Sequence, residues 1–236
     1  MSVNKEDSVR IQTSFLNAAE KKVLVWLAKR QPRWVTSDML TWVGTFGAVL
    51  AAAGYALVPR NPGFLWLSSL GFIINWYGDS LDGTLARVRN TQRPVYGYYL
   101  DHTVDAINEV VIFVGAGLSG LMHLEIALAA LVLYLMLMIN VSINAHLKKE
   151  FRLTYAKLGP TEFRLIMILV NTFFVLVSPL RDFSSSLVIF GHDLVFKALD
   201  YVGLAVTLAL AVIYIVTVRN DIREYAAADP MPGKGQ

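Results

Sequence analysis

Cysteine is absent from this chain of 236 residues, which excludes disulfides, thiolate zinc sites and cysteine nucleophiles. Histidine is scarce as well: the four histidines are scattered and never show the His-Glu-x-x-His spacing of a zinc protease. Charged residues make up only 17% of the chain, whereas hydrophobic residues make up 55% and the mean hydropathy is +0.49. This composition favours one integral membrane domain over a pair of soluble domains.

The hydrophobic residues gather into six stretches, each near the roughly 20 residues that a membrane-spanning helix needs. These stretches lie at about 39–58, 63–86, 99–121, 124–146, 162–180 and 196–218. We therefore predict an all-α integral membrane protein, built as a bundle of six transmembrane helices.

The segment before the first stretch, residues 8–32, mixes apolar positions with Lys21, Lys22, Lys29 and Arg30. This pattern is typical of an amphipathic interfacial helix that lies on an anionic membrane surface. A helix that packs on its own transmembrane bundle would show the same pattern, and both interpretations can hold together.

The predicted spans divide the chain into three parts. These are a cytoplasmic amphipathic juxtamembrane segment 1–35, a transmembrane domain 36–219 and a disordered cytoplasmic tail 220–236. Of the 21 Lys and Arg residues, all except Arg60, Arg181 and Lys197 fall on the side of the bundle that holds both termini. By the positive-inside rule, that side faces the cytoplasm.

The positive charge thus follows membrane topology and contact with membrane lipids, and we expect no nucleic-acid partner. We expect a multi-pass protein of a bacterial or archaeal inner or plasma membrane. Its polar residues near 79–105 lie on the cytoplasmic side in this arrangement.

Four carboxylates interrupt the apolar pattern: Asp79 and Asp82 near the end of the second stretch, Asp101 and Asp105 at the start of the third. Residues three or four apart share one face of a helix, so each pair projects to one side. A break at 93–97, where proline and glycine occur, would let the two helices turn back and bring the pairs together. So many acids need a cation, and oxygen ligands suit Mg²⁺ or Mn²⁺. The sequence therefore predicts a metal site for phosphate chemistry, with a buried ion-pair network as the plainer alternative.

The spacing of these acids is part of a longer pattern. In order along the chain, it consists of Asp79, Asp82, Gly83, Ala86, Arg87, Gly97, Asp101 and Asp105. These residues resemble the signature of the CDP-alcohol phosphotransferase family, whose members are also called CDP-alcohol phosphatidyltransferases. The segment 88–96 is longer than the family usually has at this place, which concerns the turn more than the carboxylates.

The resemblance implies roles for the four acids. Asp79, Asp82 and Asp101 would hold one or two divalent ions, Mg²⁺ or Mn²⁺, that polarise the phosphoryl oxygens. Asp105 would act as the general base and also contact the metal.

The resemblance also implies a pocket for the CDP group, lined by Gly83, Ala86 and Arg87. Gly83 leaves room where a nucleotide approaches the backbone, and the Arg87 guanidinium suits a phosphate. Upstream, Asp38 and Thr41 stand in a segment similar to one that lines this pocket in the family, although a serine replaces its proline. For Asp38, capping of the first transmembrane helix is an equally good explanation.

The connection between the fourth and fifth stretches is rich in basic residues. Positive-inside topology and contact with anionic lipids explain most of them. Arg164 differs because it lies one turn inside the fifth stretch, where a charge should face the interior of the bundle. By resemblance to family members that accept phosphorylated alcohols, we expect Arg164 and Arg152 to bind the acceptor.

In functional terms, the resemblance implies a metal-dependent enzyme of phospholipid synthesis. It would transfer a phosphatidyl group from CDP-diacylglycerol to a small polar alcohol, phosphorylated or not, and release CMP. Within the family, the alternative is a CDP-choline or CDP-ethanolamine type of enzyme that acts on diacylglycerol.

Other classes and assemblies also fit parts of the sequence. Asn75 and Asp79 echo the start of an intramembrane prenyltransferase motif, and a cation-binding transporter or a non-enzymatic scaffold is a further alternative. By resemblance we also expect a homodimer, for which Gly115, Gly117 and Gly120 would offer close helix contact.

Overall fold

The computed structural model describes residues 9–11, 16–148, 150–152, 159–189 and 192–231. Among these residues, each predicted stretch overlaps one long helix: α2 Ser37–Leu57, α3 Leu65–Arg89, α4 Pro94–Gly117, α5 Leu124–Lys148, α6 Pro160–Leu176 and α8 Ala198–Ala228. The shorter elements are α1 Asn17–Arg30, η1 Pro62–Phe64, α7 Ser178–Arg181, β1 Val9–Ile11, β2 Glu150–Arg152, β3 Ser184–Ile189 and β4 His192–Lys197. The predicted all-α architecture is confirmed, with two small strand pairings added to it: β1 with β2, and β3 with β4.

Three of the described helices, α2, α5 and α8, are long and apolar enough to cross a membrane. The other long helices, α3, α4 and α6, carry the charged residues of the site described below. The count of six spans therefore stays a prediction, although the six helices are present.

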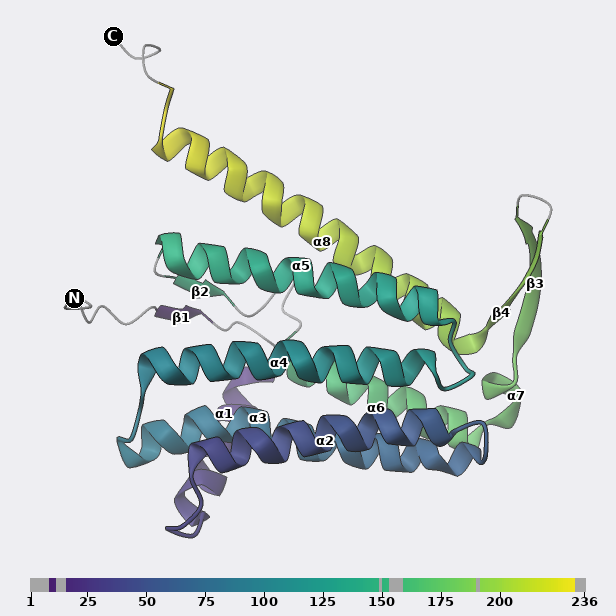
Figure 1. Ribbon diagram of the computed structural model, residues 1–236, viewed down its shortest axis with the longest axis horizontal. Coiled ribbons are helices and arrows are strands. Elements are labelled where there is room, and N and C mark those ends of the chain that lie inside the picture. Colours follow the sequence, from purple (N-terminus) through teal and green to yellow (C-terminus); the bar gives the residue numbers. More distant parts are fainter. Residues whose placement is uncertain (1–8, 12–15, 149, 153–158, 190–191, 232–236) are drawn as a thin grey trace.

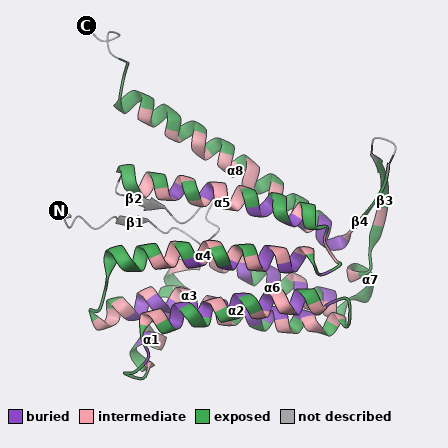
Figure 2. Ribbon diagram, in the orientation of Figure 1, coloured by how far each residue is buried: buried purple, intermediate pink, exposed green. Residues whose placement is uncertain are grey.

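The long helices run roughly side by side (Figure 1). α2 packs along α3 and α4, α6 packs on α3, and α5 lies between α4 and α8. α8 diverges from the bundle toward its C-terminal end (Figure 1) and is exposed along most of its length (Figure 2). Its exposed side chains include Leu208, Val212 and Ile215, an apolar surface that lipid would cover in a membrane.

The contact between α2 and α3 is a contact of backbones. A Cβ atom added at Gly47 would lie 2.3 Å from the backbone nitrogen of Asn75, and one added at Gly71 would lie 2.3 Å from that of Ala51. Small residues allow helices in a membrane to approach this closely. Asn75 adds a hydrogen bond from its Nδ2 to the backbone oxygen of Gly44 (3.0 Å). The N-terminal half of α2 is thereby fixed against the half of α3 that carries Asp79 and Asp82.

The glycines that we predicted to offer a dimer contact, Gly115, Gly117 and Gly120, contact parts of the same chain instead. A Cβ atom at Gly115 would lie 2.5 Å from Cα of Ala52 in α2, and one at Gly117 would lie 2.6 Å from Cδ1 of Leu124. Gly120 has a positive φ of 71° in the turn after α4. Gly115 and Gly117 thus serve packing within the chain, and the homodimer stays a prediction without their support.

The short helix α1 packs on the bundle, as one of the two interpretations of its pattern predicted. Leu24 and Ala28 are buried in a cluster with Leu81 and Leu85 of α3. The opposite face of α1 exposes Trp26 together with its basic residues. Contact of that outer face with a membrane stays a prediction.

The C-terminal boundary of the helical bundle is corrected by the structure. α8 continues to Ala228, so the part of segment 220–236 before that residue is helical, where we predicted a disordered tail. The extension is held by polar contacts with α5. Asp221 Oδ2 accepts a hydrogen bond from Nδ2 of Asn144 (2.8 Å), and the Tyr225 hydroxyl donates to Oδ1 of Asn144 (2.6 Å). Residues 232–236 lie outside the described part of the chain.

The close contact between α2 and α3 generates a prediction about stability. A Cβ atom at Gly78 would lie 2.2 Å from the backbone nitrogen of Gly44, whereas one at Gly97 meets nothing within 4 Å. We expect Gly78→Ala to lower the free energy of unfolding by about 1–3 kcal/mol, because the backbones must separate. Gly97→Ala, the matched control, should not be destabilised, since alanine favours a helix over glycine by about 1 kcal/mol. Thermal unfolding of the detergent-solubilised variants measures the difference, and equal melting temperatures would contradict the packing described.

Candidate active site

A cavity of about 1250 Å³ lies between the helices. It includes the C-terminal part of α3 and the N-terminal part of α4 in its lining. One part of its lining is polar and contains the residues of the sequence pattern. The other part is apolar and includes Met138 of α5 and Leu210 of α8. The cavity therefore combines a charged lining with an apolar one.

The chain reversal between α3 and α4 brings the acids into this cavity. α3 ends at Arg89, and the next residue, Asn90, adopts a left-handed conformation with φ of 54°, which asparagine tolerates. α4 begins at Pro94, whose fixed φ suits the first turn of a helix. The reversal therefore lies at residues 90–93, and Gly97 lies inside α4 rather than in the predicted break.

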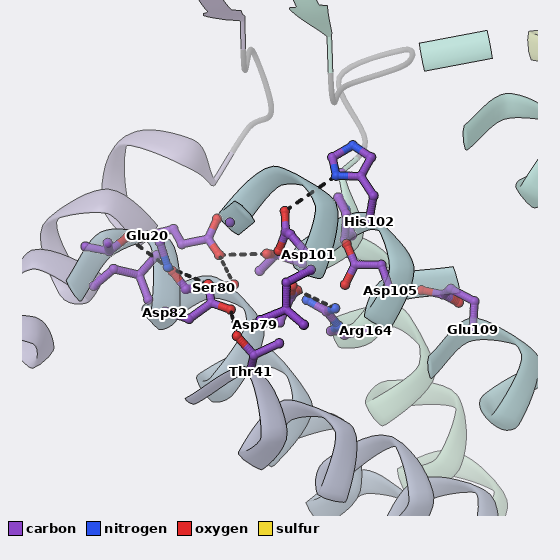
Figure 3. A pocket seen from close by; sticks show the side chains of 18 of the residues that line it. Glu20, Thr41, Asp79, Ser80, Asp82, Asp101, His102, Asp105, Glu109 and Arg164 are labelled. Carbon is purple, nitrogen blue, oxygen red and sulfur yellow. Dashed lines mark hydrogen bonds and ion pairs between the residues drawn. The ribbon is translucent and has the colours of Figure 1, made fainter. Parts of the chain in front are cut away.

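Three of the four predicted metal ligands converge at one point of the cavity. Asp79 of α3 and Asp101 and Asp105 of α4 each offer a carboxylate oxygen, and these oxygens lie within 4.8 Å of one another (Figure 3). The three residues are partly buried. Oxygen donors at this spacing are the kind that Mg²⁺ and Mn²⁺ prefer, so the residues present fit such an ion.

Asp82 lines the same cavity, but its carboxylate is engaged elsewhere. Its Oδ2 accepts a hydrogen bond from the Thr41 hydroxyl (2.7 Å), and its Oδ1 accepts one from the backbone nitrogen of Gly83. The residue is 7% exposed. In the described structure Asp82 is therefore not part of the trio, and its role as a metal ligand stays a prediction.

Arg164 of α6 lies directly against the acids, as its position inside the fifth stretch predicted. Its Nη2 donates to Oδ2 of Asp79 at 2.6 Å, and its side chain is only 10% exposed. Its Nη1 is buried and has no hydrogen-bond partner in the described part of the chain. A buried guanidinium with an unsatisfied N–H is costly unless a ligand accepts from it.

Ion pairs account for part of this cluster. Asp79 pairs with Arg164, and Oδ2 of Asp101 lies 3.9 Å from Nδ1 of His102. Arg87, the cation of the sequence pattern, donates through Nη2 to the Thr84 hydroxyl at 3.0 Å. Three carboxylates so close together also suit a divalent cation, so the metal site stays a prediction beside the plainer ion-pair alternative.

The remaining residues predicted to bind nucleotide also line the cavity. Gly83, Ala86 and Arg87 contribute from α3, and Asp38 and Thr41 from α2. A Cβ atom at Gly83 would meet Nη1 of Arg87 at an ordinary 3.4 Å, so the fold itself does not require glycine there. Close approach of a nucleotide stays the predicted reason for glycine at this position.

Asp38 does not cap α2. That role belongs to Thr36, whose Oγ1 accepts a hydrogen bond from the backbone nitrogen of Met39 (3.2 Å). Asp38 Oδ2 instead accepts from Nη2 of Arg93 (2.9 Å) and from the Tyr96 hydroxyl (3.3 Å). Both partners belong to the segment 88–96 that is longer than usual, so this segment reaches back to α2 across the polar part of the cavity.

Arg152 is the one predicted site residue whose geometry is not described. Its backbone belongs to β2, which pairs in parallel with β1. Its side chain lies outside the described residues, so its role toward an acceptor stays a prediction.

The structure adds acidic residues that our sequence analysis missed. Glu109 lines the cavity one helical turn beyond Asp105, and Tyr134 of α5 hydrogen-bonds to it. The spacing 101, 105 and 109 places three acids on one face of α4, a signal that the sequence does contain. Glu20 of α1 also lines the cavity, although nothing near it in the sequence marks it.

The sequence profile of CDP-alcohol phosphatidyltransferases matches residues 34–215. The chain belongs to this family. The match covers α2 to most of α8, including every element that contributes to the acid trio. The family assignment confirms the predicted class: an integral membrane transferase of phospholipid synthesis with an all-α fold. It leaves the prenyltransferase, transporter and scaffold alternatives without support.

Two curated proteins are similar to parts of this family member. A segment of 86 residues is 40% identical to the phosphatidylinositol phosphate synthase of Cutibacterium acnes, covering 36% of the chain and 38% of that protein. A segment of 95 residues is 35% identical to the archaetidylinositol phosphate synthase of Methanothermobacter thermautotrophicus, covering 40% of the chain and 46% of that protein. The chain thus matches less than half the length of each relative.

CDP-alcohol phosphatidyltransferases generally depend on a divalent metal, and the acid trio allows a direct test of metal binding. We expect Mn²⁺ or Mg²⁺ to raise the melting temperature of the protein, because an ion that binds only the folded state stabilises it by about 2.7 kcal/mol at a hundred times its Kd. Asp101→Asn should abolish most of this shift by removing one carboxylate. Asp193→Asn, which changes an exposed carboxylate on β4, is the control and should leave the shift unchanged. An equal shift in both variants would rule out the trio as the binding site.

Proposed function

We propose that this CDP-alcohol phosphatidyltransferase transfers a phosphatidyl group from CDP-diacylglycerol to a phosphorylated polyol and releases CMP. The observation that carries the proposal is Arg164, whose buried Nη1 is unpartnered beside the acid trio. An anionic group on the acceptor would satisfy this N–H. Both similar proteins are named for products that contain inositol phosphate, which makes inositol phosphate the first acceptor to test.

In the proposed reaction, a hydroxyl oxygen of the acceptor attacks the phosphorus that carries the diacylglycerol. The new P–O bond forms as the bond to the CMP phosphate oxygen breaks, and the hydroxyl proton passes to the Asp105 carboxylate. Asp79, Asp101 and Asp105 would hold a divalent ion, which would neutralise charge on the diphosphate. Asp82, whose carboxylate accepts a hydrogen bond from Thr41, is the further ligand that we propose for this ion.

The lining of the cavity suits both substrates. The cytidine diphosphate would lie against Gly83, Ala86 and Arg87, near the Asp38–Arg93 pair. The acyl chains would follow the apolar lining formed by α5 and α8. We place this site and both termini on the cytoplasmic side, as the Lys and Arg distribution predicts, and we keep the homodimer as a proposal.

The alternative within the family is an enzyme that moves a phospho-alcohol from a CDP-alcohol onto diacylglycerol. Its acceptor carries no phosphate, so it gives the unpartnered Arg164 N–H no ligand. The same holds for transfer to an unphosphorylated alcohol. Arg164 therefore favours an anionic acceptor.

The first test is CMP release by the purified protein with Mg²⁺ or Mn²⁺. CDP-diacylglycerol is offered with inositol phosphate, glycerol phosphate, inositol or serine, and CDP-choline is offered with diacylglycerol. We expect release only with CDP-diacylglycerol and a phosphorylated acceptor. Asp105→Asn should lower kcat by at least about 100-fold, because loss of a general base costs that much. Release with serine or inositol alone, or only with CDP-choline, would refute the proposal.

The role of Arg164 is tested by a variant that keeps its charge. Lysine can still pair with Asp79, but it lacks the second planar N–H of the guanidinium. We expect Arg164→Lys to raise the KM for the phosphorylated acceptor about tenfold, as loss of one charged hydrogen bond implies, with the KM for CDP-diacylglycerol unchanged. Arg181→Lys is the matched control, because Arg181 ends α7, beyond the other end of α6, and also pairs with an aspartate, Asp182. An unchanged acceptor KM in Arg164→Lys would remove Arg164 from the acceptor site.

A further inference from the structure

A single carboxylate oxygen joins three helices beside the acid trio. Oε1 of Glu20, in the first turn of α1, accepts hydrogen bonds from Nε1 of Trp76 (2.8 Å) and from the Thr161 hydroxyl (2.7 Å). The Ser80 hydroxyl lies 3.4 Å from the same oxygen. Trp76 and Ser80 belong to α3, and Thr161 belongs to the first turn of α6.

The partners of Glu20 adjoin two residues of the proposed site. Ser80 follows Asp79 directly in α3, and Thr161 lies one helical turn before Arg164 in α6. Asp79 and Arg164 are themselves joined by their 2.6 Å ion pair. On this side of the bundle, helices α3 and α6 are therefore connected through Glu20 and through the pair that lies in the cavity (Figure 3), in addition to the hydrogen bond from Asn171 of α6 to Ser69 of α3.

The beginning of α1 is fastened to α6 a second time. Oε1 of Glu162 accepts a hydrogen bond from the backbone nitrogen of Leu16 (3.2 Å), while its Oε2 accepts from the backbone nitrogen of Gly159 (2.9 Å). Farther along α1, Leu24 and Ala28 pack on α3. α1 thus spans from the start of α6 across α3, on the side of the bundle where the acids lie.

Glu20 is partly buried, and its carboxylate faces donors of two helices instead of open solvent alone. Where α1 only packs on α3, it uses apolar side chains such as Leu24 and Ala28. Glu20 differs from them because its carboxylate oxygen accepts hydrogen bonds from α3 and α6 at the same time. Its contribution is therefore to the relative position of these two helices.

We propose that Glu20 is a positioning residue, which makes α1 a strap that holds Asp79 of α3 and Arg164 of α6 at the spacing the transfer requires. The proposal rests on the proposed function, because Arg164 is taken to bind the acceptor and Asp79 the metal. Glu20 itself touches neither the reacting atoms nor the ion. Its effect reaches the reaction through the position of α6.

The kinetic test compares two substitutions at this position. Glu20→Gln retains an oxygen that accepts from Trp76 and Thr161, so it should keep KM and kcat within about threefold of the unmodified enzyme. Glu20→Ala removes the acceptor and should raise the KM for the phosphorylated acceptor about tenfold, while the KM for CDP-diacylglycerol changes little. Glu125→Ala, which changes an exposed glutamate in the first turn of α5, is the matched control.

Two kinetic outcomes would overturn the proposal. If Glu20→Ala leaves the acceptor KM unchanged, Glu20 does not position Arg164. If Glu20→Gln is impaired as severely as Glu20→Ala, the negative charge acts rather than the hydrogen-bond acceptor. Should Glu20→Ala fail to fold, Thr161→Val removes the donor on α6 alone and should shift the acceptor KM in the same direction.

The attachment of α1 can be measured without any turnover, because the chain has no cysteine of its own. Ala28 is 2% exposed where α1 packs on α3, so Ala28→Cys gives one buried thiol. A maleimide should label this thiol slowly when position 20 is Glu or Gln, and at least about tenfold faster in the Glu20→Ala background. Equal labelling rates in all three would refute the strap. If no substrate is turned over, the proposed function fails, and this readout still decides whether Glu20 holds α1 in place.

Discussion

Clustered negative charge is the constraint around which this protein is arranged. The carboxylates of Asp79, Asp101 and Asp105 meet between helices of a membrane protein, where charges are costly, and Arg164 pairs with one of them. Such a cluster favours a divalent ion and substrates that suit the electric field of the site. Arg164 can pair with Asp79 because α6, although distant in sequence, packs on α3.

The geometry of the acids depends in turn on how closely α2 and α3 approach. Gly44, Gly47, Gly71 and Gly78 let the two backbones touch, and this brings Thr41 within 2.7 Å of the Asp82 carboxylate. Asp82 is thereby turned away from the trio. Small residues at a helix contact therefore help to set the position of the Asp82 carboxylate relative to the trio.

The parts of the site that depend on local spacing were predictable from the sequence. Residues three or four apart share a helix face, and Pro94 marks the start of α4, so the convergence of Asp79, Asp101 and Asp105 followed from the pattern. Glu20 and Thr161 are 141 residues apart, and no periodicity connects them. The same limit applies to Asp82, whose partner lies on α2, and to the end of α8, where Asp221 and Tyr225 bond to α5.

The change of lining along the cavity has a consequence for what leaves it. CMP is soluble in water, whereas the phospholipid product belongs in the leaflet, and the cavity is lined both by charged residues and by apolar ones such as Met138 and Leu210. The two products of the proposed transfer would therefore depart by different routes, sorted by polarity alone. Neither departure needs to block the other, and the lipid never has to pass through water to join the bilayer.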